Sequence, residues 1–98
     1  MYSIDDLLHL LHSDGADRLK LRVGKPPVVV IEGEDQALDG AAISIEDAEQ
    51  FLQSIANTRQ RRELREQGRV EFMYKFRGRT SFVVCACIRE ESVEIDIH

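Results

Sequence analysis

The sequence contains no tryptophan, only two cysteines and two prolines in 98 residues, and only 6% aromatic residues. No apolar run approaches the roughly 20 residues needed to cross a bilayer. The first residues carry no basic segment, so we expect neither a secretory signal nor direct membrane insertion. With 43% hydrophobic and 32% charged residues, the chain can bury one small core under a heavily charged surface. We therefore expect a single cytoplasmic domain covering residues 1–98.

The two cysteines, Cys85 and Cys87, lie in the apolar segment FVVCACI. On a strand their Cα atoms would be about 6.6 Å apart with parallel Cβ vectors, at the limit of what a disulfide tolerates. We expect two buried, reduced thiols, as in a reducing compartment. A single C-x-C pair lacks the second ligand pair of a zinc site.

Charge is distributed unevenly along the chain, whose net charge is −5. Residues 1–58 carry four basic against eleven acidic residues (net −7), whereas residues 59–98 carry nine against seven (net +2). The basic surplus is concentrated in TRQRRELREQGR, which has no aromatic residue, so nucleic acid is not an expected partner. A solvated helix with local ion pairs explains this segment more simply. Its basic residues are Arg59, Arg61, Arg62, Arg65 and Arg69.

Three helices are predicted. Residues 4–11 carry apolar side chains at helical spacing, and Ser13-Asp14-Gly15 ends that helix. The second helix begins at an N-cap, Ser44, with Asp47 at the capping-box position. Thr58 can cap the third helix, which ends at Gly68.

Alternating apolar and polar residues predict the strands. The first strand ends at Gly24-Lys25-Pro26-Pro27, because proline cannot donate to a sheet ladder. Gly33-Glu34-Asp35 and Arg77-Gly78-Arg79 supply turns, and the last three strands form an antiparallel meander with one aromatic face. The fold class is therefore α+β, with helices packed on one face of an antiparallel sheet. The predicted strands are residues 18–23, 28–32, 36–38, 70–76, 80–89 and 92–97.

No enzymatic constellation emerges from the sequence. Asp5, His9 and His12 fall within about 60° of one another on the first helix, but no further ligand or catalytic partner can be placed beside them. Gly24-Lys25 is not a phosphate-binding loop, because Pro26 occupies the position that needs Ser or Thr. We therefore expect no catalytic residue, no cofactor and no metal.

Several short motifs follow one another at a specific spacing. Gly15-Ala16-Asp17 precedes a G-x-P-P corner, a strand that ends at a glycine, a capped helix and an acidic-Phe pair that opens a strand. This order resembles the N-terminal domain of the PilT-type twitching-motility ATPases, which belong to the superfamily of type II and type IV secretion motors. The resemblance covers nearly the whole chain. It rests mainly on Gly24, Pro26, Pro27, Gly33, Glu71, Phe72 and Phe82.

The chain also departs from the family pattern. Lys20 stands where the family usually has His, Val30 replaces the usual Arg after the corner, and the R-F-R triplet is Ser81-Phe82-Val83. In the family, as the resemblance implies, arginines from this domain approach a nucleotide that is held by the RecA-like domain. This sequence contains no counterpart of the RecA-like domain. We therefore expect this chain to keep the fold of the family domain but not its contact with the nucleotide.

The resemblance implies a PAS-like domain. The leading interpretation is a non-catalytic, stand-alone relative that assists or regulates a motility or secretion motor through protein–protein contacts. Its partner would be a motor ATPase or a second copy, reached through the arginine-rich helix or the exposed edge of the meander. Two alternatives remain open. One is a fragment of a longer motor ATPase, and the other is a PAS-like small-molecule sensor with a pocket lined by Phe72, Tyr74, Phe76 and Phe82.

Overall fold

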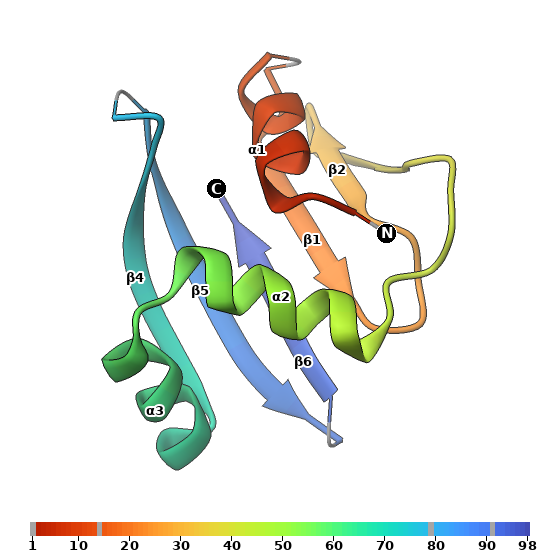
Figure 1. Cartoon of the computed structure of the whole chain (residues 1–98). Coiled ribbons are helices and arrows are strands. Elements are labelled where there is room, and N and C mark those ends of the chain that lie inside the picture. Colours follow the sequence, from red (N-terminus) through yellow and green to blue (C-terminus); the bar gives the residue numbers. More distant parts are fainter. Residues whose placement is uncertain (1, 14, 79, 91) are drawn as a thin grey trace.

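The computed structural model describes residues 2–13, 15–78, 80–90 and 92–98. Figure 1 shows a twisted sheet with the helices on one face, and the sheet has six strands. The α+β expectation is thereby confirmed. In chain order the elements are α1 (Ile4–Ser13), β1 (Arg18–Arg22), β2 (Val28–Ile31), β3 (Glu34–Ala37), α2 (Ile45–Ile55), α3 (Thr58–Gln67), β4 (Arg69–Phe76), β5 (Thr80–Arg89) and β6 (Ser92–Ile97).

The strands lie in the order β3-β2-β1-β6-β5-β4, and every neighbouring pair is antiparallel. The predicted meander of β4, β5 and β6 is therefore confirmed. The N-terminal strands join it through β1 and β6, where Leu21 lies opposite Ile95. Residues from both ends of the chain thus form one continuous sheet.

Alternation along the strands divides the sheet into two faces. One set of alternate side chains points toward the helices and is buried with the apolar stripes of α1 and α2 in one core. The other set points away from the helices, and we call that side the open face. Fully buried core residues from the strands include Leu19, Leu21, Val84, Ile95 and Ile97.

Capping interactions fix where α2 and α3 begin. The Ser44 hydroxyl accepts a hydrogen bond from the Asp47 N–H at 3.0 Å, and the Asp47 carboxylate accepts one from the Ser44 N–H at 3.0 Å, as predicted. The predicted cap of α3, Thr58, is wrong because Asn57 and Gln60 form the capping box instead. A box built from Thr58 would place an arginine at its third helical position, and arginine cannot accept a hydrogen bond.

Strand boundaries differ most at β3, which begins at Glu34 instead of at residue 36. All four of its residues are exposed, so no apolar alternation marks the strand in the sequence. Two predicted turn residues, Asp14 and Arg79, lie outside the described residues. Within the described ranges, no helix is long and apolar enough to span a membrane.

The expectation of buried thiols is wrong. Cys85 and Cys87 are free and only half-buried, because they project from the open face of β5 while their neighbours Val84 and Ala86 face the helices. The Cys85 thiol donates a hydrogen bond to Glu71 Oε2 at 3.1 Å. Burial raises the pKa of the Cys85 thiol, and the hydrogen bond and charge of Glu71 raise it further.

Candidate interaction surface

The arginines of α3 are not neutralised by the carboxylates around them. Among the described residues, no ion pair forms between these arginines and Glu63 or Glu66, so the predicted local pairs are not found. The helix offers only the spacings Arg59–Glu63 and Arg62–Glu66, in which the basic residue precedes the acidic one. This order is the less favourable one for an i, i+4 pair.

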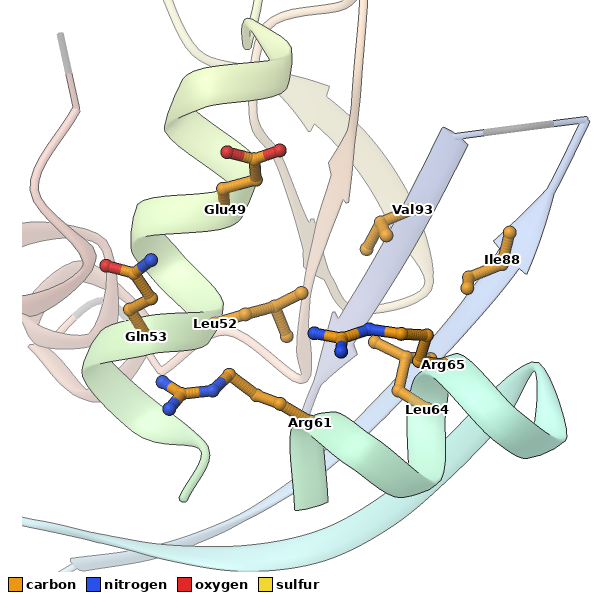
Figure 2. Close-up of a pocket in the computed structure, with 8 residues that line it drawn as sticks. All are labelled: Glu49, Leu52, Gln53, Arg61, Leu64, Arg65, Ile88 and Val93. Carbon is orange, nitrogen blue, oxygen red and sulfur yellow. The ribbon is translucent and has the colours of Figure 1, made fainter. Parts of the chain in front are cut away.

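Two of the four α3 arginines border a groove between α2 and α3. Figure 2 shows the Arg61 and Arg65 side chains extending from α3 toward α2. The groove has a volume of about 450 Å³, and Leu52 and Leu64 form its buried floor. Its remaining lining comes from Glu49 and Gln53 of α2, Ile88 at the end of β5 and Val93 of β6.

The five arginines singled out in the sequence therefore occupy different surfaces. Arg61 and Arg65 line the groove, whereas Arg59 and Arg62 are exposed on α3 and do not contribute to the lining. Arg69 is the first residue of β4 and alternates with buried Val70, so it lies on the open face. The position of α2 in the fold distinguishes the groove-lining Arg61 and Arg65 from Arg59 and Arg62.

Two basic side chains of β1 on the open face, by contrast, are paired within the sheet. Arg22 Nη2 lies 2.8 Å from Asp96 Oδ1, and its Nε lies 3.5 Å from Glu94 Oε1. Lys20 Nζ lies 3.3 Å from Asp35 Oδ2. These cations have acidic partners inside the chain, whereas the arginines at the groove have none among the described residues.

The departures from the family pattern also gather on the open face. Lys20 and Val30 alternate with the buried residues of β1 and β2, and Ser81 and Val83 do so on β5. Substitutions that are scattered in the sequence therefore modify one side of the sheet. The helix-facing side keeps its apolar side chains.

The G-x-P-P corner has a structural role. Gly24 adopts a left-handed conformation (φ +88°), and its N–H donates to the Ile43 carbonyl at 2.8 Å. The Ile43 N–H donates to the Lys25 carbonyl at 2.9 Å, so two backbone bonds join the corner to the segment before α2. Pro27 is fully buried, and Pro26 is half-buried.

The other motif residues are structural as well. Gly33 lies in the turn between β2 and β3. Phe72 and Phe82 are buried on the helix-facing side, and the ring centroids of Phe82 and Phe76 are 6.0 Å apart. The three phenylalanines proposed to line a ligand pocket are thus part of the buried core, and Tyr74 packs half-buried against it.

The residues weighed for metal binding stay apart from other ligands. Asp5, His9 and His12 are exposed on α1, and His9 Nε2 lies 3.3 Å from Ser13 Oγ. In the described part of the chain, no three His, Cys, Asp or Glu side chains converge to hold a metal ion.

Comparison with known proteins gives matches among solved structures. No protein-family model and no curated protein sequence matches the chain. The crystal structure of the pilus retraction motor PilT with bound ADP matches with a TM-score of 0.89 and 26% identity, over 100% of this chain and 29% of that chain. The ATPase DotB of Legionella pneumophila matches with a TM-score of 0.75 and 17% identity, over 97% of this chain and 28% of that chain. DotB of Yersinia pseudotuberculosis matches with a TM-score of 0.74 and 14% identity, over 97% of this chain and 29% of that chain.

These matches confirm the resemblance inferred from the sequence motifs. The chain corresponds over its whole length to the N-terminal domain of such ATPases, outside their catalytic domain. It spans about 29% of the length of the PilT chain. The likeness to DotB shows a shared fold.

Proposed function

We propose that this protein is a non-catalytic relative of the N-terminal domain of pilus-retraction and secretion ATPases, and that it assists or regulates a motor of this class in the cytoplasm. The observation that carries the proposal is the whole-chain likeness to PilT, which leaves out the catalytic domain. The protein would act by contacting other proteins.

The chemistry of the open face supports a role without nucleotide. Stabilising a phosphate requires cationic or hydrogen-bond-donating groups aimed at it. Val30 and Val83 offer neither at positions where the resemblance implies arginine. Lys20 retains a positive charge, but it is paired with Asp35.

The groove side of the molecule supports a role in protein binding. Arginine is enriched at protein interfaces, and the groove places two arginines beside the partly exposed apolar side chain of Ile88. The partner would be a motor ATPase of the PilT class or a second copy of this chain.

Binding to a purified PilT-class motor from the same organism tests the proposal. We expect a complex on size-exclusion chromatography and a change in the motor's ATP hydrolysis rate when the protein is added. Absence of a complex, with the protein strictly monomeric, would contradict the proposal. ATP hydrolysis by the pure protein would contradict the non-catalytic part.

A further inference from the structure

We infer that the groove between α2 and α3 binds an acidic amphipathic helix from a protein partner. This inference rests on the proposed function and deepens it, because it names the binding surface and the chemistry of the segment received. Two properties of the groove lead to it: an exposed apolar residue and two arginines at helical spacing. A third observation concerns its occupant, because the described residues of this chain contain no segment that could fill the groove of a second copy.

The apolar part of the groove is open to solvent at one end. Leu52 and Leu64 are buried at its floor, but Ile88 at its rim is 41% exposed. Among the described residues, the other large exposed apolar side chains, Ile45 and Met73, do not line the groove. An apolar partner side chain placed against Ile88 would remove both surfaces from water.

The charge at the groove selects an acidic partner. Arg61 and Arg65 are four residues apart on α3, so they lie on the same helix face about 6 Å apart along its axis. Glu49 is the one carboxylate among the described lining residues, and neither arginine pairs with it. Two carboxylates at positions i and i+4 of a partner helix have the same spacing, and the planar guanidinium group is well suited to carboxylates.

The described residues of a second copy of this chain offer no such segment. The first turn of α1 carries Asp5 and Asp6, but the apolar stripe of this helix is buried in its own core. The acidic strand β3 is Glu-Asp-Gln-Ala and lacks large apolar side chains. Helix α2 exposes a single large apolar residue, Ile45, beside its outer glutamates. The occupant is therefore expected from another polypeptide.

Two synthetic helical peptides of about 14 residues probe this chemistry. Both carry leucines at i, i+3, i+4 and i+7, flanked by glutamates in one peptide and by lysines in the other. With the full-length protein, fluorescence anisotropy should show binding of the glutamate peptide that weakens as salt is added, and no binding of the lysine peptide.

Substitutions on the same helix provide matched controls. The double variant R61E/R65E should weaken binding of the glutamate peptide by about ten-fold or more, whereas R59E/R62E should change it by less than about two-fold. The apolar contribution is tested by Ile88→Ser, which should weaken binding, against Ile45→Ser, which should not. Circular dichroism and thermal unfolding show whether each variant is folded.

Three results of the peptide and self-association experiments would overturn the inference. The first is no binding of the glutamate peptide, and the second is equal loss in both double-arginine variants, which indicates attraction by charge alone. The third is self-association on sedimentation that R61E/R65E abolishes, which places a second copy in the groove. Motor binding by the same variants separates the two proposals. A motor that still binds R61E/R65E contradicts the groove assignment only, whereas peptide binding without motor binding contradicts the proposed function only.

Discussion

Arg22 of β1 pairs with Asp96 of β6 at the junction between the N-terminal strands and the C-terminal meander, with Nη2 2.8 Å from Oδ1. The side chains are 28% and 30% exposed, and Asp96 Oδ1 itself is inaccessible to solvent. Arg22 also donates to the Ile95 carbonyl at 3.2 Å. Asp96 Oδ1 accepts no hydrogen bond among the described residues, so the charge of Arg22 is what compensates this buried oxygen, while the same side chain donates to a backbone carbonyl of the neighbouring strand.

Removing this side chain should destabilise the fold. We expect Arg22→Ala to lower the free energy of unfolding by about 1–2 kcal/mol, because the Asp96 carboxylate loses its ion-pair partner and the Ile95 carbonyl loses its donor. Lys20→Ala, on the same strand and face, removes an exposed pair with Asp35 and should cost less than about 0.5 kcal/mol. Urea unfolding of both variants measures the difference. Equal losses of unfolding free energy in the two variants would show that the Arg22–Asp96 pair stabilises the fold no more than the exposed Lys20–Asp35 pair.

This junction also shows what the sequence could not predict. Helices and strands are visible locally, since period-two alternation marks β1 and β4 and a capping box marks α2. The pairing of β1 with β6 joins residues more than 70 positions apart, and no local pattern encodes it. The β3 strand lacks large apolar residues, so its predicted bounds are wrong.

The candidate surface was predictable only in part for the same reason. The charge run identified the arginines, but its local ion pairs were expected from composition and do not form among the described residues. The groove combines α2, α3 and the adjoining ends of β5 and β6, which are brought together only by the fold. The three-dimensional arrangement is needed to place Arg61 and Arg65 at the groove and Arg69 on the open face.

The N-cap of α3 is a second point that can be measured. Asn57→Ala should lower the free energy of unfolding by about 1 kcal/mol, because the Gln60 N–H loses its acceptor. Thr58→Ala should change it by less than about 0.5 kcal/mol, since Thr58 does not cap the helix. Thermal unfolding of the two variants compares adjacent residues directly. A larger effect at Thr58 would contradict the observed cap.

Alkylation of Cys85 should depend on pH through Glu71. Only the thiolate reacts, and the pKa of Cys85 is raised, so its labelling should begin at higher pH than for an ordinary thiol. In a Cys87→Ser background, Glu71→Gln removes the nearby negative charge and should shift the rate profile to lower pH. Glu46→Gln removes a similar charge from α2 and serves as the control. Superimposable profiles for Glu71→Gln and its parent would rule out the coupling.

Replacing Gly24 in the G-x-P-P corner should lower the stability of the fold without changing binding at the groove. An added Cβ at Gly24 meets no atom within 4 Å, so any cost of Gly24→Ala comes from the left-handed backbone alone. We expect a loss of about 1 kcal/mol in urea unfolding, and Gly24→Asn should recover part of it because asparagine tolerates this conformation better. Binding of the glutamate peptide by folded Gly24→Ala should be unchanged, since the corner does not line the groove. If Gly24→Ala matched the parent in stability but lost binding, the corner would belong to a functional surface and the structural assignment would be wrong.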